Sequence, residues 1–201
     1  MELWEYEQMA MDEGHTLICG CDEAGAGPLA GPVYAAAVVL PFGTQVPGLD
    51  DSKKLTEKKR EALFPVVKEM ASAWAVAWVD AAEIDATDIL SARMKAMQLA
   101  INALPECPDF ALIDGNRDHG KTSAITTPHR CIVKGDSLSA SIAAASILAK
   151  VSRDHHMLEM AQVYPEYKFE KHKGYGTKVH YEALRQYGPS PIHRRTFLKN
   201  L

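Results

Sequence analysis

The feature that most constrains this 201-residue chain is a set of short apolar segments of strand length. They are residues 16–22 (TLICGCD), 33–40 (VYAAAVVL), 73–79 (AWAVAWV), 110–114 (FALID) and 131–134 (CIVK). Apolar runs of about four to eight residues that are bounded by turn residues predict buried strands. We therefore predict a sheet in which the first two segments, joined by a connection rich in glycine and proline, pair as neighbours.

Helical patterns separate these segments. Thr56 is a suitable N-cap for a charged helix, which Pro65 is expected to end or kink. Asp80 and Glu83 form a capping-box-like pattern. The apolar residues that follow are spaced alternately by four and three positions, as on one face of a helix: Leu90, Met94, Met97, Ile101 and Leu104. Pro105 is expected to end this amphipathic helix.

A last long helix is expected over residues 139–162, where small residues (SASIAAAS) let the backbone approach a sheet or a ligand closely. Strands followed by helices predict an α/β domain with a mixed sheet. The chain is long enough for one sizeable domain. We assign residues 1–163 to it and residues 164–201, richer in Lys, His, Gly and Pro, to a C-terminal subdomain.

Charge is unevenly distributed along the chain. The net charge of −4 argues weakly against nucleic-acid binding. Residues 164–201, however, contain eight Lys and Arg against three Asp and Glu, a balance of +5 that leaves −9 for the rest. A basic region that contacts nucleic acid and an ordinary solvated surface both remain open at this point.

The sequence also bears on location. No segment approaches the roughly 20 apolar residues of a membrane-spanning helix, so no membrane association is expected. No Lys or Arg precedes Lys53, which argues against a secretory or transit signal and favours the cytoplasm. Four cysteines lack the paired spacing of a zinc site and are expected to be buried free thiols: Cys19, Cys21, Cys107 and Cys131.

Three of the predicted strands end in or near an acidic residue. Asp22 and Glu23 follow the first, Asp114 closes FALID, and Asp136 comes one glycine after CIVK. Strand ends and the loops after them are where α/β proteins assemble their sites. Because side chains alternate along a strand, Glu23 is expected to lie where the strand gives way to the loop at residues 25–27.

Four carboxylates brought together would repel one another unless a cation neutralised them. Ligands that are all oxygen suit Mg²⁺ or Mn²⁺ rather than zinc, and such a site could hydrolyse phosphodiesters by two-metal catalysis. The alternative is structural, because strand-end aspartates often cap helices or form turns. Asp136, just before Ser137–Ser139, fits that alternative well.

The chain resembles one family along nearly its whole length, the type 2 ribonucleases H and specifically bacterial ribonuclease HII. The matching blocks are CDEAGAGPLAGPVYAAAVVLP (21–41), DSKKLTEKKR (51–60), LIDGN (112–116), KGDSLSASIAAASILAKVSRDHHM (134–157) and HKGYGTKVH (172–180). One such block would be weak evidence, whereas five in family order are hard to attribute to chance.

The resemblance implies a ribonuclease H-like mixed α/β sheet flanked by helices, with a small helical C-terminal extension. It places the family's catalytic and metal-binding carboxylates on Asp22, Glu23, Asp114 and Asp136. Asp154 resembles a further carboxylate that assists the second metal, with an exposed helix residue as the alternative. The implied activity is endonucleolytic cleavage of RNA in RNA:DNA hybrids and of single ribonucleotides in duplex DNA, which leaves a 3′ hydroxyl and a 5′ phosphate.

Substrate contacts are implied as well. Gly25, Ala26 and Gly27 would contact the 2′-hydroxyl through backbone groups, and Tyr175 would pack against the sugar at the RNA-to-DNA junction. Ala26 departs from the family pattern, which has arginine there, so a phosphate contact by that side chain is lost. Candidates for other phosphate contacts are Lys53, Lys54, Lys173 and Lys178.

Two other functions remain open on the sequence alone. One is a nucleic-acid-binding protein of the same fold in which Ala26 has cost recognition or turnover. The other is a metal-dependent phosphatase acting on a small phosphoester, which would need similar carboxylates but no junction-sensing tyrosine. A monomer is expected in each case.

Overall fold

A five-stranded mixed sheet forms the centre of the computed structural model, which describes residues 3–49, 55–116 and 125–199. Its strands are β1 (Ile18–Ala24), β2 (Val33–Val39), β3 (Ala73–Val79), β4 (Phe110–Asp114) and β5 (His129–Ile132). The order is β3-β2-β1-β4-β5; β1, β2 and β3 are antiparallel neighbours, and β4 and β5 continue parallel to β1. The predicted mixed sheet and the predicted pairing of the first two strands are confirmed.

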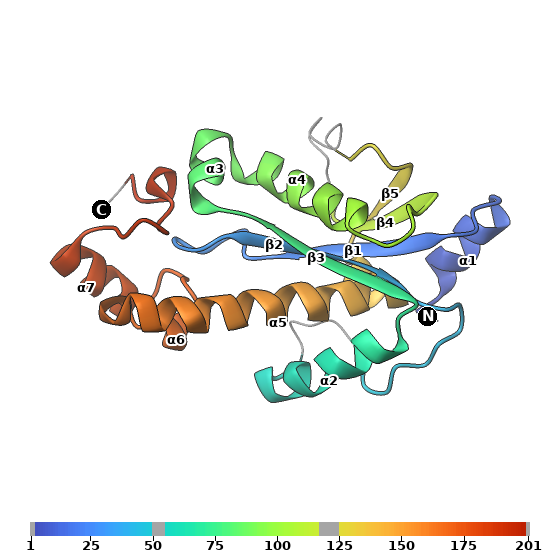
Figure 1. Ribbon diagram of the computed structural model, residues 1–201, viewed down its shortest axis with the longest axis horizontal. Helices are drawn as coiled ribbons and strands as arrows, with labels where there is room; N and C mark the ends of the chain where they lie inside the picture. The colour runs from blue at the N-terminus through green and yellow to red at the C-terminus, as the bar shows by residue number, and fades with distance from the viewer. Residues whose placement is uncertain (1–2, 50–54, 117–124, 200–201) are drawn as a thin grey trace.

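Helices cover both faces of this sheet (Figure 1). One face carries α3 (Ala81–Ala86) and α4 (Ile89–Asn102), and the other carries α2 (Glu57–Met70) and the long α5 (Ala140–Val163). Of the shorter helices, α1 (Glu5–Asp12) lies at one end of the molecule, and α6 (Phe169–His172) and α7 (Lys178–Tyr187) lie at the other (Figure 1). The 3₁₀ helices are η2 (Gly135–Ser137), η3 (Pro165–Tyr167) and η4 (Arg195–Phe197). No helix in the described part of the chain has the length and apolar character needed to cross a bilayer.

Strand β1 shows which residues face which helix. Cys19 and Cys21 pack in the core cluster beneath α4, so Gly20 and Asp22 face α5. At Gly20 the approach of α5 is so close that a Cβ would lie 2.2 Å from the carbonyl carbon of Ser141. The start of α5 is therefore fixed directly against the strand that carries Asp22.

Several predicted element bounds were wrong. The helix capped by Thr56 continues through Pro65 to Met70, because the residues on either side of the proline, Leu63 and Val67, are buried in the core. The last strand runs over residues 129–132 and not 131–134, and it ends before Lys134, which adopts a left-handed backbone conformation (φ 57°).

The region after β3 forms two helices. Asp80 caps α3 as predicted, accepting a hydrogen bond from the Glu83 N–H at 2.8 Å. Asp88 then begins α4 by accepting from the Ser91 N–H at 2.9 Å. The amphipathic pattern was correct, but it belongs to the second helix, with a cap that the pattern did not reveal.

The cysteine prediction was half right. All four cysteines are free, and Cys19 and Cys21 are buried, where burial raises the pKa of the Cys21 thiol. Cys107 and Cys131 are exposed. Cys19 and Cys21 therefore belong to the hydrophobic core, whereas Cys107 and Cys131 lie at the surface.

The C-terminal residues pack onto the end of α5 and onto the loop that follows β1. The cluster between them joins Leu29, Ala30 and Met157 to Tyr167, Phe169, Ala183 and Leu184. A single bridge between Ala30 and His193 adds a backbone connection. The loop after Asp22 and Glu23 is thus held between the sheet and the C-terminal segment.

Candidate active site

Asp22 and Asp114 lie side by side on the α5 face of the sheet. In the parallel pair β1–β4, Gly20 is opposite Leu112 and Cys21 is opposite Ile113, so the two aspartates occupy the next position of each strand. Side-chain alternation directs both toward α5. Asp22 is only 4% exposed. The two carboxylates predicted from strand ends are therefore neighbours.

Asp136 joins them from the short helix η2. The N–H of Gly135 donates to Asp114 Oδ1 at 2.7 Å, which fixes the residue before Asp136 against the end of β4. Asp136 is 3% exposed. The capping alternative for Asp136 was wrong, because Ser139 caps α5 by accepting from the Ile142 N–H.

Glu23 lies inside β1 and not beyond it, so the expectation that the strand ends before Glu23 was wrong. It pairs with Ala35 of β2, and its side chain leaves the strand on the α4 face, opposite to Asp22. There Arg93 Nη2 of α4 contacts Glu23 Oε1 at 2.6 Å. The Glu23 N–H donates to Asp22 Oδ1 at 2.7 Å, so the two adjacent acids are coupled through the backbone.

The donor set fits a hard divalent cation. Asp22, Asp114 and Asp136 offer only carboxylate oxygens, two of them from nearly buried side chains, which suits Mg²⁺ or Mn²⁺. Within residues 3–49, 55–116 and 125–199, no group of three or more His, Cys, Asp or Glu side chains is already arranged to hold a metal. The structure thus places Asp22 and Asp114 side by side and binds Gly135, the residue before Asp136, to Asp114. The four acidic side chains are not yet arranged as one set of metal ligands.

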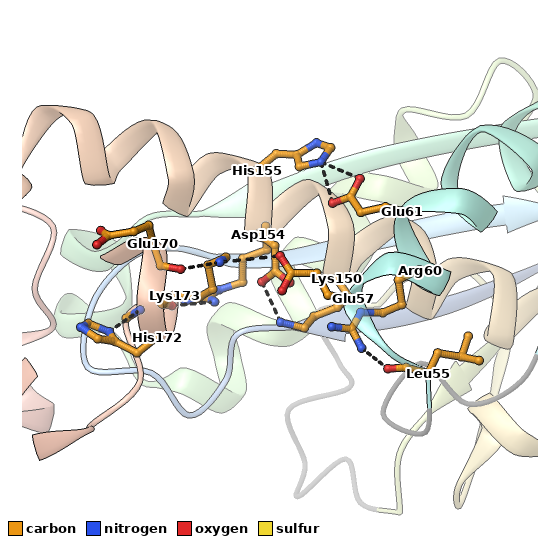
Figure 2. Close-up of polar contacts among 12 residues, drawn as sticks. Leu55, Glu57, Arg60, Glu61, Lys150, Asp154, His155, Glu170, His172 and Lys173 are labelled. Atoms are coloured by element: carbon orange, nitrogen blue, oxygen red, sulfur yellow. Dashed lines mark hydrogen bonds and ion pairs between the residues drawn. The ribbon is translucent and has the colours of Figure 1, made fainter. Parts of the chain in front are cut away.

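Asp154 belongs to a line of charged residues between α2 and α5 (Figure 2). Asp154 is 4% exposed, and its Oδ1 forms an ion pair with Lys150 Nζ at 2.7 Å. The alternative that Asp154 is an exposed helix residue was therefore wrong. Further along, His155 Nε2 contacts Glu61 at 2.9 Å. Asp154 is therefore a buried, cation-paired carboxylate one helical turn beyond Lys150.

The predicted phosphate-binding lysines have different environments. Lys173 is largely buried; its Nζ donates to the Glu170 carbonyl at 2.8 Å and lies 3.8 Å from Glu57 (Figure 2). Lys178 is fully in solvent and lies 3.9 Å from Glu182. Lys53 and Lys54 fall outside the described residues.

The glycine loop and Tyr175 lie together, as the resemblance implied. Gly25 is buried with φ 95°, a conformation that favours glycine, whereas Gly27 is exposed. A Cβ on Gly27 would meet only Tyr175 Cε1, at 3.8 Å. Tyr175 is 44% exposed. The Tyr175 ring and Gly27 are therefore exposed side by side, in the part of the structure that follows Asp22 and Glu23 of β1.

Buried histidines support Tyr175 from below. The Ser190 N–H donates to His193 Nδ1 at 2.9 Å, so the proton of His193 resides on Nε2. That Nε2 donates to His180 Nε2 at 2.9 Å, and His180 Nδ1 donates to the Tyr175 carbonyl at 2.9 Å. Burial lowers the pKa of both histidines to about 4, so both are neutral at physiological pH.

Sequence reasoning missed three arginines at this site. Arg93 holds Glu23, and Arg153 and Arg194, both fully buried, hydrogen-bond to the backbone around the glycine loop. An arginine that will be buried looks the same in sequence as one on the surface. The basic balance of residues 164–201 even counted Arg194 as part of a charged surface, and the structure removes it from that surface.

Comparison with known proteins identifies the family. A family model described as ribonuclease HII matches residues 19–200. The chain belongs to the ribonuclease HII family. A ribonuclease HII of Idiomarina loihiensis is 55% identical to it over 181 residues, which are 90% of this chain and 95% of the relative. The chain is accordingly a nuclease of the hydrolase class, from a family that acts on RNA in RNA:DNA hybrids.

Solved structures agree on the fold of this ribonuclease HII family member. The crystal structure of the ribonuclease H2 from Pyrococcus horikoshii OT3 matches with a TM-score of 0.75 and 28% identity, over 90% of this chain and 93% of that chain. The crystal structure of Bst-RNase HIII in complex with Mn²⁺ shares the fold, with a TM-score of 0.68 and 20% identity over 94% of this chain and 66% of that chain. The predicted ribonuclease H-like sheet with flanking helices is confirmed.

Proposed function

We propose that this protein is an endonuclease that cuts the RNA strand of RNA:DNA hybrids and also cuts at single ribonucleotides embedded in duplex DNA. The proposal rests on one juxtaposition: the half-exposed ring of Tyr175 lies against Gly27, in the loop that directly follows Asp22 and Glu23. An enzyme that cuts at a ribonucleotide must sense the 2′-hydroxyl. A glycine loop beside an aromatic ring, adjacent to buried carboxylates, is suited to that task.

We assign metal binding and catalysis to Asp22, Asp114 and Asp136, together with Glu23. Bound Mg²⁺ or Mn²⁺, two ions in this scheme, would activate water and stabilise the leaving 3′ oxygen, which gives 3′-hydroxyl and 5′-phosphate ends. The Mn²⁺ in the Bst-RNase HIII structure supports this class of cofactor. Asp22 and Asp114 lie on the α5 face of the sheet, and in this proposal Glu23 contributes either through its second oxygen or after losing its Arg93 contact.

Substrate positioning falls to the loop and the C-terminal segment. The exposed Gly27 allows the main chain to approach a sugar, and the Tyr175 ring offers a flat apolar surface for the neighbouring deoxyribose. Lys173 lies where a phosphate could replace Glu57 as its anionic neighbour. Lys53, Lys54 and Lys178 complete the proposed backbone contacts, which position a duplex without reading its sequence. Action as a monomer in the cytoplasm stays a prediction.

The test uses three duplexes of the same sequence: all DNA, DNA with one ribonucleotide, and an RNA:DNA hybrid, each with Mg²⁺ or Mn²⁺. We expect cutting of the last two only, with products that carry 3′-hydroxyl and 5′-phosphate ends. Hydrolysis of a small phosphoester without any cutting of either ribonucleotide-containing duplex would contradict the proposal and favour a phosphatase.

A further inference from the structure

Arg194 binds the glycine loop from beneath. Its guanidinium donates to the carbonyl oxygens of Gly25 at 2.6 Å, Ala26 at 2.9 Å and Gly31 at 2.9 Å, and the side chain is completely buried. Three carbonyls of one loop are thus fixed by a single planar group. The rigid fork of arginine suits this task, which a lysine cannot reproduce.

Arg153 of α5 holds the other half of the loop. It donates to the carbonyls of Ala30 at 3.2 Å and Pro32 at 3.1 Å, and to that of Lys173 at 3.0 Å. A Cβ at Gly25 would lie 2.0 Å from Arg153 Nε, so the loop rests directly on this side chain. Because Lys173 precedes the turn of Tyr175, Arg153 connects the two parts of the proposed ribose site.

The carbonyls are therefore directed inward, and this leaves the opposite side of the peptides for substrate. Within the described part of the chain, the N–H groups of Ala26 and Gly27 donate to no acceptor. Ala26 is half-buried and Gly27 is exposed. The carbonyl oxygens of these peptides are bound by the arginines, and their N–H groups remain available. Such N–H groups are suited to donate to a sugar hydroxyl or a phosphate oxygen.

The two arginines also bring charge. Neither makes an ion pair with a carboxylate among the described residues, and all six of their hydrogen bonds go to neutral carbonyls. Burial and the neighbouring charge of Arg153 lower the pKa of Arg194 to about 9, which still leaves it charged at neutral pH. The nearby carboxylates, Asp154 for Arg153 and Asp85 for Arg194, favour the charged arginines but contact neither guanidinium. Two buried cations that hydrogen-bond only to carbonyls give the loop a positive potential, which would attract a polyanion.

We propose that Arg194 and Arg153 are positioning residues for ribonucleotide recognition, which orient the N–H groups of the glycine loop and supply beneath it the positive charge that Ala26 does not supply from above. The inference rests on the proposed function, since it assumes that the loop contacts the ribonucleotide. It adds two residues that touch the loop and not the substrate.

The test measures ribonucleotide preference in binding, using Arg194→Lys, Arg153→Lys and the matched control Arg195→Lys. Arg195 is exposed and adjacent to Arg194, so the control makes the same chemical change one residue away. Affinities for a duplex with one ribonucleotide and for an all-DNA duplex are measured in EDTA, and kcat and KM are measured with Mn²⁺. Thermal unfolding shows that each variant is folded at the assay temperature.

We expect Arg194→Lys and Arg153→Lys to lower the preference for the ribonucleotide duplex at least about tenfold, with less than a threefold change in all-DNA affinity, and Arg195→Lys to change neither. A purely structural role would reduce the folded fraction without changing the preference of the folded molecules. Folded variants that keep the wild-type preference would overturn the inference. So would failure of both buried-arginine variants to fold, because the arginines would then serve the whole fold and not the loop.

The same experiment separates failure of the proposed function from failure of the positioning role. A wild-type protein that cuts no ribonucleotide-containing duplex overturns the proposed function itself. A wild-type protein that cuts at the ribonucleotide, with arginine variants that keep its preference, overturns only the positioning role.

Discussion

Ala26 stands between two glycines, at a position where the resemblance to the family implies an arginine. Its backbone is well fixed, because its carbonyl accepts from Arg194 Nη1 at 2.9 Å. What the chain lacks is therefore one cationic side chain on an otherwise complete loop. A duplex should therefore bind more weakly than it would to the same loop with an arginine at position 26, because one phosphate contact is missing.

Restoring that side chain gives a direct prediction. In Ala26→Arg, duplex affinity should rise several-fold at low salt, and the slope of log K against log salt should become steeper by about 0.9, the value of one neutralised phosphate in duplex DNA. Fluorescence anisotropy across a salt series measures both. Ala26→Gln is the control, since it adds a polar side chain without charge; equal slopes for the two variants would show that the arginine contacts no phosphate.

At this scale the sequence predicted the acids better than the bases. Asp22, Asp114 and Asp136 are predicted site residues because strand-end acids have a recognisable position in the sequence, and the family resemblance implies the same residues. Arg93, Arg153 and Arg194 were missed, because nothing in the sequence distinguishes an arginine that binds carbonyls in the interior from one in solvent. Their role depends on long-range contacts, such as that of Arg194 with Gly25.

At the scale of elements, the contact between β1 and α5 determines where the carboxylates lie. Strand alternation correctly predicted that Asp22 and Glu23 point to opposite faces while the chain is extended, but it could not show that β1 continues through Glu23 to Ala24. That extension depends on pairing with Ala35 and Tyr34 of β2, a tertiary contact. The small residues at the start of α5 predicted a close approach, and Gly20 is where it occurs.

Gly20→Ala should therefore be severely destabilising. Its Cβ would lie 2.2 Å from the Ser141 carbonyl carbon and 2.3 Å from the Ile142 nitrogen, backbone atoms that cannot move without displacing α5. We expect a loss of about 3 kcal/mol or more in the free energy of unfolding, at the upper end of overpacking costs. Gly27→Ala, whose Cβ would meet only a ring carbon at 3.8 Å, should cost less than about 1 kcal/mol. Urea unfolding of both variants tests this; similar losses would contradict the close contact.

At the scale of the whole molecule, the C-terminal segment closes onto the catalytic sheet through buried polar groups as well as apolar ones. Arg194, His180 and His193 all lie in the interior. The sequence predicted a basic, helical C-terminal region, and the helices are present. The sequence could not show that some of these histidines and arginines are buried, because their burial depends on packing between segments that are far apart in the chain.

Acid sensitivity should follow from the histidine pair. Their pKa is about 4 in the folded protein and about 6.5 in the unfolded chain, so the unfolded state binds more protons between these values. Stability should be unaffected above pH 7 and should fall as the pH drops from 6.5 to 4, by up to about 1 kcal/mol per pH unit for each histidine, or about 2–4 °C in Tm.

Thermal unfolding between pH 7.5 and pH 4.5 measures this dependence. His193→Gln should be less stable at pH 7.5 but should lose less on acidification than the wild type. His155→Gln, which changes an exposed histidine, should follow the wild-type curve. A wild-type Tm that stays constant down to pH 4.5 would show that the buried pair does not resist protonation.

We propose that Asp22 and Asp114, near the ends of β1 and β4, belong to the metal-dependent catalytic site and not to the substrate-binding surface. Asp22→Asn tests it most directly, with cleavage and binding of the single-ribonucleotide duplex measured on the same preparation with Mg²⁺ or Mn²⁺. We expect cleavage to fall by at least about a thousandfold, while duplex affinity stays within about threefold of the wild type. Retained cleavage, or an equal loss of cleavage and binding in a folded variant, would contradict it.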